Sequence, residues 1–224
     1  MATVSNILVK NPEYYTVWNN RRQILQCLFS QAENAGDGAS ASGRVRDFIE
    51  ADLDFLIPLL RQFPKCYWIW NHRLWLLEQA ALRLPRPDAR KLWQQELALV
   101  GKMLSLDSRN FHGWGYRREV VAALESLADD GENEHTMTGA ELDYTTKMIG
   151  TNLSNFSAWH NRSQLILKLL HERSASDTER KKALDDGELL LNTLPCIKPD
   201  IKKKNVWSLS NSSVSQSSNS YIEP

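Results

Sequence analysis

The sequence has few of the residues that build covalent or metal frameworks. Its 224 residues include three cysteines, Cys27, Cys66 and Cys196, which lie far apart and form no Cys-x-x-Cys pair. This spacing indicates neither a disulfide framework nor a zinc site carried by this chain, and it fits a reducing compartment. We therefore expect no metal ligands here.

Long apolar runs and an excess of one charge are also absent. The run Phe55–Leu60 is far shorter than the roughly 20 residues that span a bilayer. Residues 1–9 lack the basic and apolar segments of a signal peptide. Lys plus Arg equals Asp plus Glu at 27 each. These absences predict no transmembrane segment, no nucleic acid as the main partner, and a cytoplasmic location.

An internal repeat dominates what is present. Four tryptophans, at positions 18, 70, 114 and 159, are spaced 52, 44 and 45 residues apart. An aromatic stands three residues before each of them, an arginine three after and an aliphatic residue seven after: Tyr15, Tyr67, Phe111, Phe156; Arg21, Arg73, Arg117, Arg162; Leu25, Leu77, Val121, Ile166. Such self-similarity at a fixed period is typical of repeat architectures.

Offsets of three and seven put residues on one face of a helix, so each copy predicts the second helix of a hairpin. We expect the first helices at 45–63, 89–106 and 138–149, and loops at 34–42, 85–87 and 128–137. Thr138 with Glu141 and Ser176 with Glu179 have capping-box spacing, which marks helix N-termini. Asn11-Pro12 and Phe63-Pro64 predict turns.

The predicted fold is all-α, a right-handed α–α superhelix of helical hairpins. Residues 1–10 form an N-terminal extension, 11–194 the repeats and 195–224 a Lys- and Ser-rich tail. The tail has few apolar residues to bury, so we expect it to be disordered.

A residue type that recurs in every copy is more economically explained by packing than by chemistry. We expect the four tryptophans, Trp18, Trp70, Trp114 and Trp159, to be core, and the four arginines to bond to helix ends of neighbouring repeats. Phosphate binding is the alternative for the arginines.

Functional candidates are positions where one copy differs. Lys65 and Arg109 stand five residues before their tryptophans, and His112 stands two before. They fall at the starts of second helices, whose partial positive charge favours an anion such as diphosphate. A solvated surface role is the plainer alternative for each.

The four motifs resemble the repeats of protein prenyltransferase α subunits. They are Asn11–Arg22, Pro64–Arg73, Arg109–Arg118 and Asn152–Arg162. The sequences of the last two motifs are most similar to those of the type II, or Rab geranylgeranyltransferase, branch. The resemblance covers residues 11–194. It implies a crescent of hairpins around an α–α barrel β subunit, which carries the catalytic zinc.

The resemblance also implies roles for single residues. Lys65 matches the lysine that reaches the prenyl diphosphate and Tyr67 the tyrosine beside it, which makes these two the expected catalytic residues. Asn110 and His112 match positions that face the active-site cleft, and Arg109 lies beside them. The implied partners are a β subunit, Rab escort protein, Rab GTPases with C-terminal cysteines, and geranylgeranyl diphosphate.

Two alternatives stay open. A non-catalytic helical-repeat adaptor of tetratricopeptide type is disfavoured because that family's 34-residue period is absent. An inactive shortened subunit is the other alternative, since type II α subunits carry further helical sequence before the first motif and at least one more repeat after the last.

Overall fold

The computed structural model describes residues 1–35, 38–128, 135–172, 174–182 and 185. Within these ranges the secondary structure is helical and contains no strand, which confirms the all-α prediction. The labelled helices are α1 (Ala2–Lys10), α2 (Tyr15–Asn34), α3 (Gly38–Gln62), α4 (Tyr67–Arg83), α5 (Arg86–Leu106), α6 (Phe111–Ser126), α7 (His135–Thr151) and α8 (Phe156–Glu172). No helix in the described ranges is long and apolar enough to cross a membrane.

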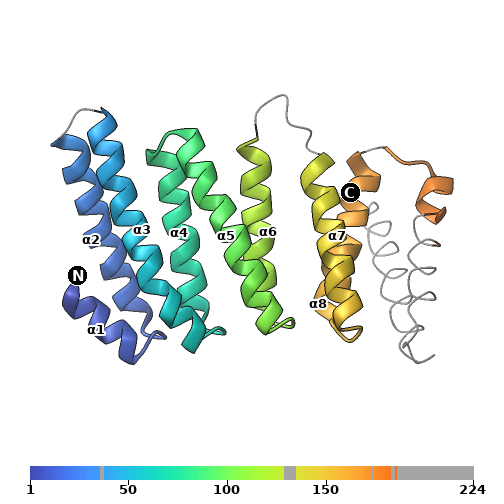
Figure 1. Cartoon of the computed structure of the whole chain (residues 1–224), viewed down its shortest axis with the longest axis horizontal. Coiled ribbons are helices and arrows are strands. Elements are labelled where there is room, and N and C mark those ends of the chain that lie inside the picture. Colours follow the sequence, from blue (N-terminus) through green and yellow to red (C-terminus); the bar gives the residue numbers. More distant parts are fainter. Residues whose placement is uncertain (36–37, 129–134, 173, 183–184, 186–224) are drawn as a thin grey trace, which may run out of the picture. The chain divides into compact units, whose positions relative to one another are not determined.

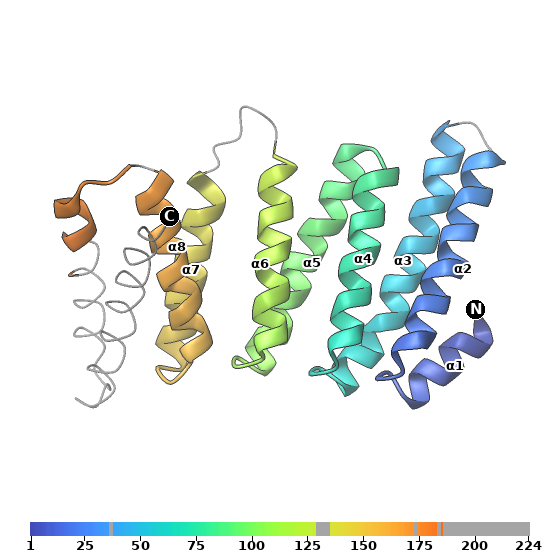
Figure 2. The same ribbon diagram turned by 180° about the vertical axis from the view of Figure 1, so that it is seen from behind.

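The chain divides into two compact units, residues 1–132 and 133–224. In the first unit α1–α2, α3–α4 and α5–α6 are consecutive helical hairpins, and α1 to α6 follow one another across the unit in Figure 1. Each helix packs on the next, and the second helices also contact one another, α2 with α4 and α4 with α6. Figure 2 shows α2, α4 and α6 as one layer with α3 and α5 behind it.

The tryptophan of each motif joins the helix core to the turn before it. Trp18, Trp70 and Trp114 are buried. Each indole N–H donates to the carbonyl six residues earlier: to Pro12 at 2.7 Å, Pro64 at 2.8 Å and Ser108 at 2.9 Å. A phenyl ring has no donor for this bond, so the structure explains why the column is tryptophan rather than any large apolar residue.

The N-terminal segment, predicted only as an extension at residues 1–10, contains the helix α1. Leu8 of α1 is fully buried, and Ser5 Oγ accepts a hydrogen bond of 2.8 Å from Arg21 Nη1 of α2. Residues 2–10 are therefore the first helix of the first hairpin. First helices carry no tryptophan motif, so this one had no signature of its own.

Three predicted boundaries are wrong. Helix α5 begins at Arg86, inside the loop expected at 85–87. Helix α3 begins at Gly38, inside the loop expected at 34–42, where Arg44 bonds Ser40 Oγ and the Ala32 carbonyl and so holds the first turn against the end of α2. Helix α7 begins at His135, so Thr138 lies within the helix instead of capping it.

Other local predictions are confirmed. Short turns that contain Pro12 and Pro64 precede α2 and α4. Ser176 and Glu179 form a reciprocal capping box: the Ser176 amide and hydroxyl donate to Glu179 Oε2, and the Glu179 amide donates to Ser176 Oγ, directly before the helical residues 177–182. The tail predicted at 195–224 lies outside the described residues.

The second unit contains the hairpin α7–α8. Trp159 is half-buried, and its indole N–H donates to the Leu153 carbonyl at 3.0 Å. Arg162 Nη1 donates to the Leu142 carbonyl at 3.0 Å and to Thr146 Oγ1 at 2.7 Å, both on α7. The fourth motif therefore repeats the indole-to-turn bond of the other three.

Candidate functional site

The first buried polar cluster joins the first two hairpins. Arg21 of α2 donates through Nε to both oxygens of Asp52, at 3.0 and 3.2 Å, and through Nη2 to Asp52 Oδ1. Asp52 lies in the middle of α3. His72 of α4 lies on its other side, with Nε2 2.8 Å from Asp52 Oδ2. We call Arg21, Asp52 and His72 the Asp52 node.

The same arrangement recurs one repeat later. Arg73 of α4 donates through Nε to Glu96 Oε2 at 3.1 Å and through Nη2 to Oε1, and the Tyr116 hydroxyl of α6 donates to Oε2 at 2.6 Å. We call Arg73, Glu96 and Tyr116 the Glu96 node. The prediction that these arginines bond to helix ends is wrong, because their partners are carboxylates inside helices and, for Arg73, also the Leu53 carbonyl.

The sequence also carries a signal for these carboxylates, which are not among the residues predicted above. Asp52, Glu96 and Glu141 each stand 18 residues before a motif tryptophan. The residue two after the tryptophan completes the two nodes described above, as His72 and Tyr116. Arg117, which continues the arginine column, is buried on α6.

The two nodes differ in how they respond to protons. Arg22 Nε, which can only donate, lies 3.3 Å from His72 Nδ1, so Nδ1 accepts and the proton sits on Nε2 toward Asp52. Burial lowers the pKa of His72, against the opposing effect of Asp52. Burial alone would raise the pKa of Asp52, but the bonds from His72 and Arg21 lower it overall. Burial raises the pKa of Tyr116 well above its usual range.

Turn residues tie one repeat to the next. Asn110 Oδ1 accepts from the amides of His112 and Gly113, which caps α6, and its Nδ2 donates to the Pro64 carbonyl at 2.8 Å. Asn110 is 3% exposed. Its amide is therefore occupied in shaping the turn.

Cys66 takes the same place in the preceding turn. Its Sγ lies 3.5 Å from the Pro12 carbonyl, one repeat earlier, as Asn110 Nδ2 lies against Pro64. Burial raises the pKa of the Cys66 thiol. Because a thiol is a weak donor, the hydrogen bond from Cys66 is weaker than the corresponding bond from Asn110.

The aromatic column is exposed, contrary to the expectation that recurring positions are packed. Tyr15, Tyr67, Phe111 and Phe156 are between 51% and 67% exposed. In the first unit their rings form a connected row at the starts of α2, α4 and α6. Ring centroids are 5.7 Å apart for Tyr15–Trp68, 5.2 Å for Trp68–Tyr67, 6.2 Å for Tyr67–His112 and 4.0 Å for His112–Phe111. We call these five residues the aromatic rim.

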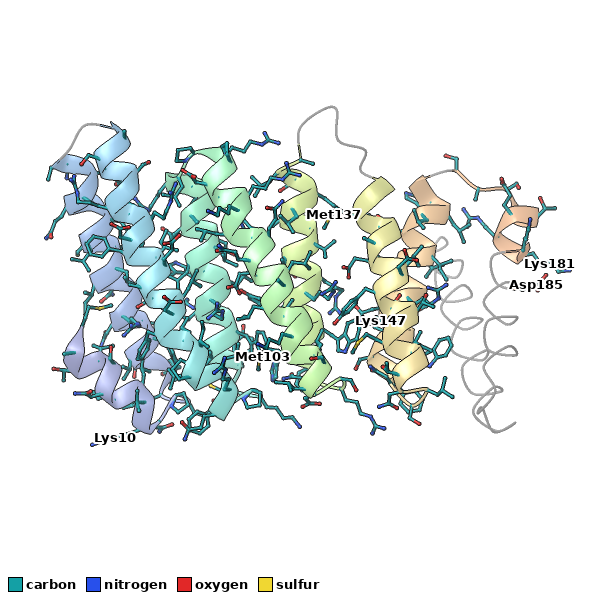
Figure 3. All side chains as sticks on the ribbon, viewed as in Figure 1. Lys10, Met103, Met137, Lys147, Lys181 and Asp185 are labelled. Carbon is teal, nitrogen blue, oxygen red and sulfur yellow. The ribbon has the colours of Figure 1, made fainter. Side chains whose placement is uncertain are left out.

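The predicted anion-binding residues lie at or beside this rim. Lys65 is 73% exposed, and its Nζ lies 3.7 Å from Asp107 Oδ2, a surface pair of little energetic weight. Arg109 is exposed. Burial lowers the pKa of His112, partly offset by Glu13, which favours the neutral form of its imidazole. In Figure 3 Lys10 is labelled near the end of α1 and Met103 near the end of α5. These labels mark the end of the first unit where the turns before α2, α4 and α6 lie.

In the described residues, no three His, Cys, Asp or Glu side chains come together as a metal site would require.

Comparison with known proteins identifies the repeat. The family model described as protein prenyltransferase alpha subunit repeat matches residues 1–28, 49–80, 93–124 and 139–169, more than half of the chain. The first of these matches includes α1, which agrees with its place in the first hairpin.

Several similar proteins carry the name geranylgeranyl transferase type-2 subunit alpha. The chain is 41% identical to that of Saccharomyces cerevisiae over 172 residues, which are 77% of this chain and 46% of the relative. It is 42% identical to that of Candida albicans over 173 residues (75% and 43%) and 40% identical to that of Rattus norvegicus over 169 residues (75% and 25%). The chain thus matches less than half the length of these relatives. With its four repeats matched, this chain belongs to the protein prenyltransferase α-subunit family.

Proposed function

We propose that this chain serves as the α subunit of a heterodimeric, cytoplasmic protein geranylgeranyltransferase, which transfers a geranylgeranyl group from its diphosphate to C-terminal cysteines of Rab GTPases. One observation supports this most strongly. An exposed lysine, Lys65, stands beside the aromatic rim, which includes the exposed Tyr67 and the half-buried His112. The names of the similar type-2 subunits support the lipid and the class of acceptor.

The chemistry assigned to these groups is electrostatic. As the bond between prenyl C1 and oxygen breaks, negative charge grows on the diphosphate leaving group. An ammonium group aimed at it stabilises the transition state more than the ground state. Lys65 supplies that charge, and Tyr67 and His112 supply neutral hydrogen-bond donors next to it.

The β subunit is proposed to hold the zinc ion, which would keep the acceptor cysteine sulfur deprotonated at neutral pH. Three rings of the aromatic rim, those of Tyr15, Tyr67 and Phe111, are exposed and offer apolar area for contact with that subunit. Rab escort protein would present the GTPase to the complex.

Co-purification tests the partner. The chain should form a stable heterodimer with a type-2 β subunit and transfer geranylgeranyl to a Rab C-terminal cysteine when escort protein is present. Absence of association would contradict the proposal. Association without transfer would instead support an inactive form of the subunit.

A pair of variants tests the surface. Phe111→Asp places a charge in the aromatic rim and should abolish co-purification. Leu82→Asp is the matched control, because Leu82 is 78% exposed near the opposite end of α4, and it should leave co-purification unchanged. Equal effects of both variants would rule out the rim as the contact.

A further inference from the structure

A chain of hydrogen bonds leads from the buried Asp52 node to the aromatic rim. Arg22 of α2 donates through Nε to His72 Nδ1 at 3.3 Å and through Nη2 to Asn71 Oδ1 at 2.6 Å. Asn71 Nδ2 in turn lies 3.3 Å from the Tyr67 hydroxyl oxygen. The path therefore crosses from α2 to α4 and ends on a residue expected to touch the diphosphate.

The direction of each bond follows from what the groups can do. A guanidinium has no acceptor, so the Asn71 atom that faces Arg22 must be the carbonyl oxygen. The amide nitrogen then faces Tyr67, and because that nitrogen can only donate, the phenol oxygen accepts. The hydroxyl proton of Tyr67 is left free to point away from Asn71, and Tyr67 is 51% exposed.

Among the described residues the complete path, from arginine through asparagine to a tyrosine hydroxyl, occurs in one repeat only. In the next copy the residues that correspond to Tyr67, Asn71 and Arg22 are Phe111, Gly115 and Leu74, none of which has a polar side chain. Scaffold contacts recur from copy to copy, as the indole-to-turn bonds and the two nodes do. A polar path present once is instead what a single site requires.

We infer that Asn71, held by Arg22, is a positioning residue that fixes the Tyr67 hydroxyl as an outward-facing donor to the anion bound at the rim. The role in turnover rests on the proposed function. The direction of the hydroxyl does not depend on it.

Asn71→Asp reverses the last bond with almost no change in shape. The carboxylate still accepts from Arg22, but it now also accepts from Tyr67, so the phenol proton turns inward. Asn19→Asp is the matched control, since Asn19 follows Trp18 as Asn71 follows Trp70, is exposed, and gains the same charge. Tyr67→Phe removes the hydroxyl altogether.

The first measurement uses the full chain alone, labelled with ¹³C at the Cζ atom of tyrosine. The Tyr67 resonance is the one that disappears in Tyr67→Phe. It should move downfield in Asn71→Asp, as a phenol does when it donates to a carboxylate, and stay in place in Asn19→Asp. An unmoved Tyr67 resonance in Asn71→Asp overturns the inference, whatever the complex does.

The second measurement is turnover of the heterodimer. Asn71→Asp should lower kcat about tenfold, the loss expected when one hydrogen bond to the transition state is removed. It should leave KM for the Rab substrate unchanged. In the Tyr67→Phe background the same change should have less than about a twofold effect, because the group it acts through is gone. Equal losses in both backgrounds, or no loss at all in an active complex, overturn the inference. If the unmodified complex shows no transfer, the proposed function fails, and the Tyr67 resonance still decides the direction of the hydroxyl.

Discussion

The Asp52 node and the Glu96 node have the same geometry and different chemistry. In both, a first-helix carboxylate lies between an arginine of the preceding second helix and a hydrogen-bond donor of the following one. The donor is a neutral imidazole in one and a phenol in the other. The comparison shows that the repeat conserves a buried charge pair while the third member is free to vary, and with it the response to pH.

The largest expected effect comes from removing one charge of the Glu96 node. Arg73→Met leaves the Glu96 carboxylate buried with Tyr116 as its remaining donor, which should lower the free energy of unfolding by about 3–5 kcal/mol. Arg21→Met should lower it by less, because His72 can take up a proton and pair with Asp52. Urea unfolding followed by tryptophan fluorescence measures both, since six of the eight tryptophans lie within residues 1–132. A larger loss for Arg21→Met would contradict the comparison.

A smaller effect is expected at the turns that hold the nodes in place. Asn110→Ala removes the cap of α6 and the bond to Pro64 together, and it should lower the free energy of unfolding by about 2 kcal/mol. Ser105→Ala is a suitable control, because the Ser105 hydroxyl is exposed and bonds only within its own helix, to the Lys102 carbonyl. Similar losses in the two variants would mean that Asn110 has no special part in the turn.

The pH dependence of stability should separate the nodes. The lowered pKa of His72 means that the unfolded chain takes up this proton near pH 6.5 while the native chain does so only at lower pH. Stability from His72 is therefore fully present above about pH 6.5 and falls below it, by at most about 1.4 kcal/mol per pH unit. His72→Gln keeps a donor for Asp52 and should flatten this slope in thermal unfolding between pH 5 and 7. His160→Gln, at an exposed histidine, should not. Unchanged slopes in His72→Gln would show that His72 is not the responsive group.

The smallest effect sharpens the comparison of turns. Cys66→Asn replaces the thiol between the first and second hairpins with an amide like that of Asn110, which joins the second and third. The new hydrogen bond to the Pro12 carbonyl should raise the free energy of unfolding by about 1 kcal/mol. Cys27→Asn, at an exposed cysteine, should change it little. A destabilised Cys66→Asn would mean that the cavity around the thiol is too tight for the amide.

The repeat was readable from the sequence because tryptophan and arginine recur at fixed offsets in every copy. Helix α1 was not, since its place depends on Leu8 and Ser5 meeting α2, a tertiary contact without a local signature. The Thr138–Glu141 spacing predicted the wrong start for α7, because a capping box is a four-residue pattern that also occurs inside helices. The carboxylates Asp52 and Glu96 were predictable in principle from their constant distance to the tryptophans.

The site was only partly predictable. The offsets placed Tyr67 and His112 at the starts of second helices, where they lie, and Lys65 beside them, where it lies in the turn before α4. They did not show that Asn110 is buried in the turn, nor that Arg22 and Asn71 reach Tyr67 from two different helices. Contacts of that kind depend on side-chain direction across a hairpin, which linear spacing does not encode.

Replacement of Lys65 tests most directly the view that repeated buried groups hold the scaffold while exposed groups present in one copy perform the chemistry. Lys65→Ala should lower kcat of the heterodimer by about 10²–10³ and leave its assembly intact, because the side chain is exposed and makes only one long surface pair. Lys91→Ala, at an exposed lysine near the start of α5, should change neither. An undiminished kcat for Lys65→Ala in an assembled, active complex would contradict the account.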